Sequence, residues 1–252
     1  MMESGKTRRL ARIFRDDGKT VIVPMDHGVS VGPVEGLGDV KRTVNQVAKG
    51  GADAILVHAG VAKTVDTTEV GLILHLSGAT RLANEPDWKT QLCTVKEAVR
   101  LGADAVSVHI NVGSEHEQDM LDNFSQIMDD CDDYSMPLLA MMYPRGPKIR
   151  DEHSYEVVSH AARLFRDVVN SVRVRVVVAG GPKADSVSEC LRTVYECINA
   201  GAAGVSIGRN VFQHQDPTIM TRAIAEIVHN EANPGNAPFT QGDKSETVLA
   251  RT

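Results

Sequence analysis

A short apolar run near the N-terminus ends in two side chains that can exchange protons. Residues 20–30 read TVIVPMDHGVS, so β-branched and apolar residues are followed at once by Asp26 and His27. Such a run predicts a strand buried on both faces. Ionisable groups then belong at its carboxyl end, where the active sites of α/β barrels lie. Asp26 is therefore a candidate catalytic residue, although an aspartate in this position can also cap the following loop.

A second group that can exchange protons follows another apolar run. Residues 137–146 read PLLAMMYPRG, which places Tyr143 and Arg145 at the end of a predicted strand. Across a barrel mouth, Tyr143 and Asp26 would form an acid–base pair facing the reactive carbons of a substrate. The alternative is that Tyr143 only seals the rim, since tyrosines favour half-buried edges.

Glycines that end the last two strands predict a phosphate site. The runs VVVAGGPK and VSIGRN place glycine at both turns, and an arginine follows the second. Glycine lets backbone N–H groups approach a phosphate, and arginine adds a charged hydrogen bond. Glycine pairs also serve tight turns, but their presence on two adjacent final strands favours phosphate. The candidate residues are Gly180, Gly181, Gly208 and Arg209.

Histidines and lysines near other strand ends give weaker signals. His58, His75 and His109 have no carboxylate at ligand spacing, so no metal site is predicted. Lys63 and Lys148 are typical of solvated loop lysines.

Repeated segments define the elements that must position these groups. GGADAILVH, LGADAVSVHI and AGAAGVSIG each follow a helix that closes at glycine and open a strand rich in valine or isoleucine. Helical stretches with charged outer faces, such as residues 94–100 and 115–130, alternate with the strands. At this length the pattern predicts one (β/α)8 TIM barrel over residues 1–232. Residues 233–252 mix Pro, Gly and polar residues and are expected to form a loosely ordered tail.

The strand count is one short of a closed barrel. Seven strands are predicted, where eight are needed. Between the helix at 155–164 and the strand at 174–180 lie nine residues, FRDVVNSVR, that read as more helix. The missing strand is the sixth. The seven predicted strands begin near Thr20, Asp53, Gly71, Asp104, Pro137, Val174 and Gly204.

Composition excludes several classes of partner. Charged residues make up 24% of the chain, apolar residues 42%, and the net charge is −6. An acidic chain without a basic stripe is not expected to bind nucleic acid. No apolar stretch approaches membrane-spanning length, so no membrane association is expected. The cysteines, without a CxxC pair, indicate free thiols in a cytoplasmic protein: Cys93, Cys131, Cys190 and Cys197.

Four motifs together resemble the archaeal class I aldolase family. They are VPMDHGVS at 23–30, AMMYPRG at 140–146, VAGGPK at 178–183 and GRNVFQH at 208–214, and the resemblance extends over about residues 8–229. It implies an enzyme that cleaves and forms C–C bonds through a lysine imine, without metal or organic cofactor. It also implies a homo-oligomer, of a ring type such as a decamer.

The resemblance implies a particular branch and particular roles. DHGVS followed by Gly32 and Pro33, together with MMYPRG, favours synthases that join a three-carbon unit from a deoxy-ketohexose phosphate to aspartate semialdehyde, on a route to dehydroquinate and aromatic amino acids. Fructose-bisphosphate aldolase is the alternative. Asp26 would accept a proton and Tyr143 would donate one. Substrate contacts would come from Asp26, His27, Gly28, Val29, Ser30, Tyr143, Pro144 and Arg145, with phosphate at Gly180, Gly181, Gly208 and Arg209.

The chain departs from the family where the sixth strand is missing. Family members carry a segment of the type GADxVKTxYTGD, which holds the imine lysine, but here Leu164 runs directly into Phe165. A true deletion would leave buried backbone groups unpaired at about 1–3 kcal/mol each, against a total stability of about 5–15 kcal/mol. We therefore expect that the sequence omits a mobile segment. If the segment is absent, the chain is a non-catalytic phosphate-binding paralogue, or Lys183 replaces the lysine. We expect Lys183 to act structurally or electrostatically instead.

Overall fold

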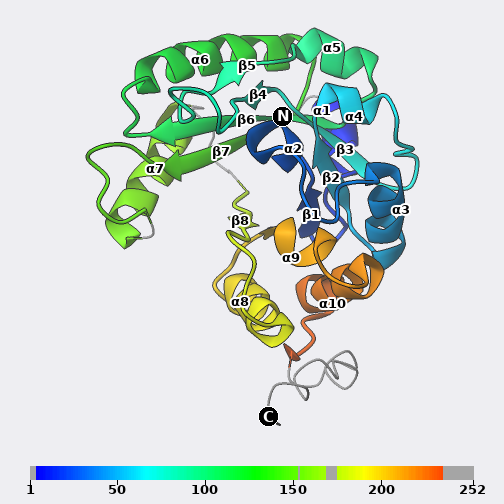
Figure 1. Ribbon diagram of the computed structural model, residues 1–252. Coiled ribbons are helices and arrows are strands. Elements are labelled where there is room, and N and C mark those ends of the chain that lie inside the picture. Colours follow the sequence, from blue (N-terminus) through cyan, green and yellow to red (C-terminus); the bar gives the residue numbers. More distant parts are fainter. Residues whose placement is uncertain (1–3, 153, 169–174, 235–252) are drawn as a thin grey trace.

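The parallel sheet is the frame of the molecule, and it is open on one side. The structure is a computed structural model that describes residues 4–152, 154–168 and 175–234. Seven parallel strands curl into a half-barrel, in the spatial order β7-β6-β3-β2-β1-β9-β8, with helices outside them (Figure 1). The strands are β1 (Thr20–Pro24), β2 (Ala54–Val57), β3 (Gly71–His75), β6 (Ala105–Val112), β7 (Leu138–Pro144), β8 (Val178–Ala179) and β9 (Gly204–Ser206).

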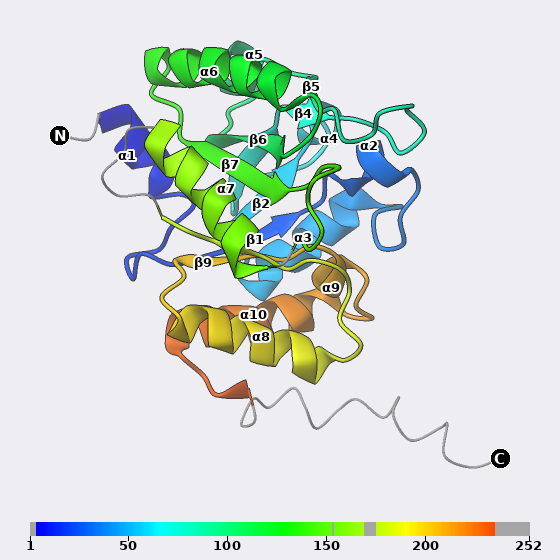
Figure 2. The ribbon, with the colours of Figure 1, turned by 90° about the vertical axis from the view of Figure 1, so that its left-hand side faces the viewer.

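Helices connect successive strands and cover the outer face of the sheet. The longer helices follow the predicted pattern, with caps such as the Thr94 side chain accepting from the Glu97 N–H. In the view turned by 90°, α7 lies across β7 (Figure 2). The helices are α1 (Ser4–Leu10), α2 (His27–Val31), α3 (Val40–Gly50), α4 (Ala59–Ala62), α5 (Val95–Arg100), α6 (Glu117–Asp133), α7 (Tyr155–Val168), α8 (Val187–Asn199), α9 (Arg209–Phe212) and α10 (Pro217–Asn230).

The predicted strand count is confirmed, and so is the position of the gap. The sheet ends at β7 on one side and at β8 on the other, which are the fifth and the last but one strand of the predicted barrel. Helix α7 passes through Leu164 and Phe165 without interruption. The expectation of an omitted segment stays a prediction, and in the described residues no strand pairs with the free edge of β7 or β8.

The expectation that such a deletion prevents this arrangement is wrong. Strands β6, β3, β2, β1 and β9 each keep two neighbours, so most of the ladder does not depend on closure. Residues Leu138–Tyr143 of β7 are only half-buried, whereas every residue of β1, β2 and β3 is buried. Edge groups that stay open to water avoid the cost of burial without a partner. Of the strand predicted over 174–180, residue 174 lies outside the described residues, and Val178–Ala179 form β8, which pairs with β9.

Side chains alternate between two cores along each strand. Val21, Val23 and Ile55 point outward against the helices, whereas Ile22 and Leu56 point into the barrel. The inward residues Leu139, Met141 and Val177 are only partly buried, as expected next to a missing strand. A smaller antiparallel pair, β4 (Ser77–Gly78) with β5 (Thr90–Gln91), was not predicted. Among the described helices, none is long and apolar enough to cross a membrane.

Carboxylates of the repeated Gly-Ala-Asp segments lock the amino-terminal end of the barrel. Asp53 accepts the N–H of Val21 at 2.7 Å, and Asp104 accepts the N–H of Leu72 at 2.9 Å, so each ties a strand to its neighbour. Each also forms an ion pair, Asp53 with Arg15 and Asp104 with Arg12. These aspartates hold the sheet at the end opposite the strand ends that carry Asp26 and Tyr143.

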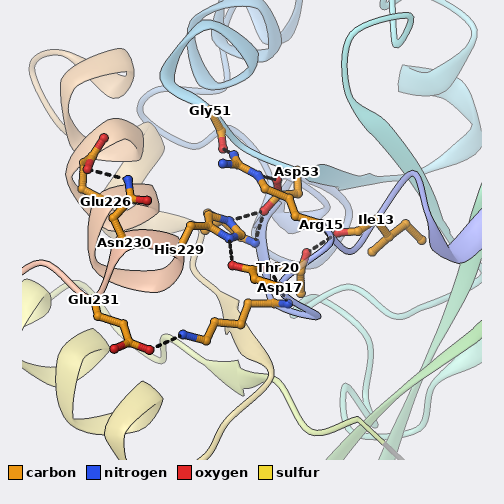
Figure 3. A network of polar contacts seen from close by, with 12 residues as sticks. Ile13, Arg15, Asp17, Thr20, Gly51, Asp53, Glu226, His229, Asn230 and Glu231 are labelled. Atoms are coloured by element: carbon orange, nitrogen blue, oxygen red, sulfur yellow. Dashed lines mark hydrogen bonds and ion pairs between the residues drawn. The ribbon is translucent and has the colours of Figure 1, made fainter.

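His229 joins the end of α10 to this base (Figure 3). Its Nδ1 lies 2.8 Å from an Asp17 carboxylate oxygen and its Nε2 lies 2.8 Å from an Asp53 oxygen. Burial lowers the pKa of His229, but the hydrogen bonds to Asp53 and Asp17 outweigh it, so the pKa is raised. Arg15 and Lys19, beside the same carboxylates, complete the network.

We predict that His229→Gln destabilises the fold in a pH-dependent way. A raised folded-state pKa stabilises the protein fully below the ordinary value of 6.5, and that contribution is lost as pH rises through the folded value. Removing the imidazolium from two carboxylates should cost about 2–4 kcal/mol at pH 6 in denaturant unfolding and clearly less at pH 9. His160→Gln, at an exposed histidine, is the control. An equal loss at both pH values would contradict the assignment of the charge.

Candidate active site

The inward-facing positions of the strands carry polar side chains toward the carboxyl end. Along β6 the inward residues are Ala105, Ser107, His109 and Asn111, so apolar groups give way to hydrogen-bonding ones. The register between β3 and β6 places His75 beside Ser107. Because the strands are parallel, their carboxyl ends form one rim of the half-barrel, and the candidate residues lie there.

Asp26 stands at the end of β1 with its carboxylate available for chemistry. It is the N-cap residue of α2, but its side chain makes no capping hydrogen bond. The reading of Asp26 as a structural cap is therefore wrong. Its Oδ1 lies 3.5 Å from His27 Nδ1, its Oδ2 lies 3.8 Å from His75 Nε2, and the side chain is 16% exposed. A carboxylate that keeps access to solvent between two imidazoles suits a proton acceptor.

The imidazoles around Asp26 are held neutral. Burial lowers the pKa of His75 to about 4, against the opposing charge of Asp26. Its Nδ1 lies 2.7 Å from Ser107 Oγ, which fixes the ring. Burial also lowers the pKa values of His27 and His58. The described residues contain no cluster of His, Cys, Asp or Glu that could hold a metal ion.

Tyr143 lies on the inward face of β7 and is stacked on a buried histidine. Its ring centroid is 4.6 Å from that of His109, at an interplanar angle of 24°, and the Arg145 guanidinium lies 5.7 Å from the tyrosine ring. Burial raises the pKa of Tyr143, and the negative charge of Asp26 raises it further. Tyr143 and Asp26 therefore share one electrostatic environment, in which the phenol keeps its proton and can donate it.

Two hydrogen bonds hold His109 in place. Its Nε2 lies 2.8 Å from Asn111 Oδ1, and its backbone N–H donates to Ser77 Oγ at 2.8 Å. Burial lowers the pKa of His109 to about 3, so it is a neutral ring under Tyr143. Sequence reasoning considered His109 only as a metal ligand and missed its contact with Tyr143, which the pairing of Asn111 with Tyr143 across β6 and β7 explains.

The predicted phosphate loops lie side by side. Arg209 Nη2 donates to the Gly181 carbonyl at 2.8 Å, and Arg209 Nε is buried without a hydrogen-bond partner in the described chain. The N–H groups of Gly181 and Gly208 also have no acceptor among the described residues. The N–H of Gly180 donates to the Ser206 carbonyl, so Gly180 supports the loop and cannot supply that N–H to a phosphate.

Both glycine turns have packing reasons as well. A Cβ at Gly180 would lie 2.8 Å from Ile207, and one at Gly208 would lie 2.7 Å from the Pro24 carbonyl oxygen. Gly181 has a φ of +61°, in the region that favours glycine. The alternative of tight turns thus explains the glycines in part, while the unpaired Arg209 Nε still indicates an anion.

The remaining predicted substrate contacts fall around the same rim. Residues His27, Gly28, Val29 and Ser30 belong to α2, directly after Asp26. Pro144 is buried at the end of β7, and the guanidinium of Arg145 pairs with Glu152 at 3.3 Å. Lys183 is exposed, and its Nζ donates to the Gln213 carbonyl at 3.2 Å, so it braces the loop after α9.

The four cysteines are free, as predicted. Cys131 and Cys190 are buried, and burial raises their pKa values to about 12 and about 11. Cys93 and Cys197 are half-buried, and burial raises the pKa of each thiol. None is activated as a thiolate.

Comparisons with known proteins also point to an aldolase. The family model described as DeoC/LacD family aldolase matches residues 20–168 and 161–214. The chain is 41% identical to the 2-amino-3,7-dideoxy-D-threo-hept-6-ulosonate synthase of Halobacterium salinarum, covering 93% of this chain and 95% of that protein. It is 43% identical to synthase 1 of the same name from Archaeoglobus fulgidus, covering 89% and 91%. A solved Schiff-base-forming fructose-1,6-bisphosphate aldolase superposes with a TM-score of 0.83 at 32% identity, covering 89% and 100%.

The matches also locate the missing segment. The two parts of the family match overlap at residues 161–168, inside α7. The alignment with the Halobacterium protein is 255 residues long, whereas 93% of this 252-residue chain is about 234 residues. About 20 aligned positions therefore have no counterpart here. That length fits one strand with its connecting turn, the element that the sheet lacks between β7 and β8.

We predict that Arg209→Gln weakens binding of a ketose phosphate. The substitution removes the unpaired buried Nε and the positive charge, so the Kd for dihydroxyacetone phosphate should rise about 10- to 100-fold in calorimetric titration. Arg222→Gln, at an exposed position on α10, is the matched control. Equal affinities for Arg209→Gln and the unmodified chain would rule out the phosphate loops.

Proposed function

We propose a function for this chain from one premise: it belongs to the DeoC/LacD family of aldolases. The chain acts as an aldolase of the ulosonate synthase type. It takes a three-carbon unit from a deoxy-ketohexose phosphate and joins it to aspartate semialdehyde, on a route to dehydroquinate and aromatic amino acids. A cytoplasmic location and an assembly of several copies are part of the proposal and rest on the family resemblance.

The meeting of Asp26 and Tyr143 at one rim is the observation that carries the proposal. An aldol cleavage needs a base for the hydroxyl proton and an acid for the carbonyl oxygen. Asp26 is uncapped and partly open to solvent, and Tyr143 is kept protonated by burial and by the charge of Asp26. Arg209 and Gly181, which follow β9 and β8 beside β1, support binding of a substrate phosphate.

Two alternatives have specific support. The 32% identity and the TM-score of 0.83 to a fructose-1,6-bisphosphate aldolase favour a related cleavage of fructose bisphosphate. The absence of the segment that the resemblance expects to hold the imine lysine favours a phosphate-binding paralogue without turnover. The identities of 41% and 43% to two ulosonate synthases place the synthase activity first.

The test supplies the purified chain with a deoxy-ketohexose phosphate and aspartate semialdehyde, and follows the product by mass spectrometry. Formation of the ulosonate supports the proposal. Cleavage of fructose bisphosphate without use of aspartate semialdehyde would favour the first alternative. Binding of the ketose phosphate with no product from either pair would favour the second.

We predict that Asp26→Asn and Tyr143→Phe each lower kcat by about 10²- to 10⁴-fold, the usual range for loss of a general acid or base. Both changes are nearly isosteric, so the melting temperature should stay close to that of the unmodified chain. Tyr134→Phe, at an exposed tyrosine, is the control for loss of a phenol. A kcat for either variant within about threefold of the control would exclude that residue from the proton transfers.

A further inference from the structure

Imine chemistry needs an amine at the rim, and the described lysines offer few. Lys6, Lys19 and Lys63 form ion pairs with Asp132, Glu231 and Glu97. Lys183 is exposed and braces a loop through the Gln213 carbonyl. Lys89 differs from these, because it is half-buried and no carboxylate of the described chain lies within ion-pair distance of its Nζ.

The unpredicted hairpin brings Lys89 to the mouth of the barrel. Strand β4 follows β3 directly, and its Gly78 pairs with Thr90, the residue after Lys89. Ser77, the other residue of β4, accepts the backbone N–H of His109. Lys89 therefore sits beside the carboxyl ends of β3 and β6, the strands that carry the rings next to Asp26 and Tyr143.

Two contacts anchor the segment before Lys89 on the rim, and a third, from Lys89 Nζ to Pro86, lies within the segment itself. Asn111 Nδ2 donates to the Asp87 carbonyl at 2.7 Å, and Lys89 Nζ donates to the Pro86 carbonyl at 2.6 Å. The Trp88 ring stacks on His116 with centroids 4.1 Å apart and an interplanar angle of 7°. Since Asn111 also fixes the His109 ring, the Lys89 segment and the platform under Tyr143 are parts of one network.

The surroundings of Lys89 lower the pKa of its ammonium group. Burial lowers the pKa of Lys89, the positive Arg145 lowers it further, and Asp87 opposes them. The charge of Lys89 in turn lowers the pKa values of His75 and His109, after burial as the main cause. Those are the rings beside Asp26 and under Tyr143, so the ammonium lies within electrostatic reach of both sides of the site. Desolvation of a lysine is an established way to activate it.

We propose that Lys89 supplies the amine that forms the imine with the ketose substrate, in place of the lysine of the absent sixth strand. The inference rests on the proposed aldolase function. It concerns a residue that sequence reasoning missed, because an isolated lysine before a two-residue strand carries no periodic signal. Lys183, the substitute considered from the sequence, is exposed, whereas Lys89 is half-buried.

Each step balances with the groups present. The Lys89 nitrogen adds to the keto carbon, the oxygen takes a proton from Tyr143, and loss of water leaves an iminium. Cleavage of the adjacent C–C bond sends its electron pair into the iminium, while Asp26 takes the hydroxyl proton and the first aldehyde leaves. The resulting enamine adds to the second aldehyde, whose new alkoxide takes the proton back from Asp26. Water then hydrolyses the iminium, which frees the product and restores the amine, and the phenol regains its proton from solvent.

The test traps the imine on the whole chain. The protein is incubated with dihydroxyacetone phosphate and borohydride, which reduces an imine to a stable secondary amine, and the modified peptide is mapped by mass spectrometry. The expected result is one adduct per chain, on the peptide that contains Lys89. An adduct on any other lysine overturns the proposal.

Variants separate the role of the amine from the role of the charge. Lys89→Met and Lys89→Arg should both lose the adduct and lower kcat by about 100-fold or more, because arginine keeps the charge but cannot form the imine. Lys63→Met, at an exposed lysine that pairs with Glu97, should keep both. Activity of Lys89→Arg close to that of the unmodified chain overturns the proposal. Adduct mapping on the unmodified chain decides the matter even if a variant fails to fold.

The outcomes distinguish this proposal from the function on which it rests. Turnover of the sugar phosphate without any adduct leaves the aldolase function standing and overturns Lys89. An adduct at Lys89 without turnover of either substrate pair supports Lys89 as the reactive amine and removes the proposed function. Neither adduct nor turnover overturns both.

Discussion

A parallel barrel must supply every strand with two neighbours, and this constraint is met for five of the seven parallel strands that the structure describes. Strand β1 is held between β2 and β9, and Gly204 allows the approach to β9, because a Cβ there would overlap the Thr20 carbonyl oxygen. The ladder from β6 to β9 is thus independent of the gap. Asp26 at the end of β1 and the rings of β3 and β6 depend on this ladder. Tyr143 depends on the free-edged β7 and on its seven-residue pairing with β6.

The two ends of the sheet use the same residue type for different purposes. At the amino-terminal end, Asp53 and Asp104 accept strand N–H groups and pair with arginines, so their charges are fully engaged. At the carboxyl end, Asp26 accepts no capping bond and faces imidazoles that burial keeps neutral. A carboxylate with satisfied partners stabilises structure, whereas one with neutral neighbours keeps its capacity to accept a proton.

The sequence was informative wherever the signal was local. Buried apolar runs located seven strands and the gap, and the strand ends located Asp26, Tyr143 and Arg209. Features that depend on contacts between residues far apart in the chain could not be predicted. His229 reaches Asp53 across 176 positions, although the repeated Gly-Ala-Asp segments marked Asp53 as special. The strands β4 and β5 are too short to show an alternating hydrophobic pattern, so no sequence pattern pointed to Lys89. The effect of the missing strand on folding was overestimated, because the unpaired backbone groups were assumed to be buried. Strand β7 is half-buried, and its edge is open to water.

The central claim is that the barrel is open beside β7 while the rest of its ladder is intact, and amide hydrogen exchange resolved by residue tests it most directly. The account predicts that amides of β1, β2 and β3 exchange only on global unfolding. Those amides of β7 that point away from β6 should exchange faster than their neighbours by about 100-fold or more, in an alternating pattern along the strand. Uniform slow exchange along β7, equal to that of β2, would show that its edge is covered in solution and would contradict the open barrel.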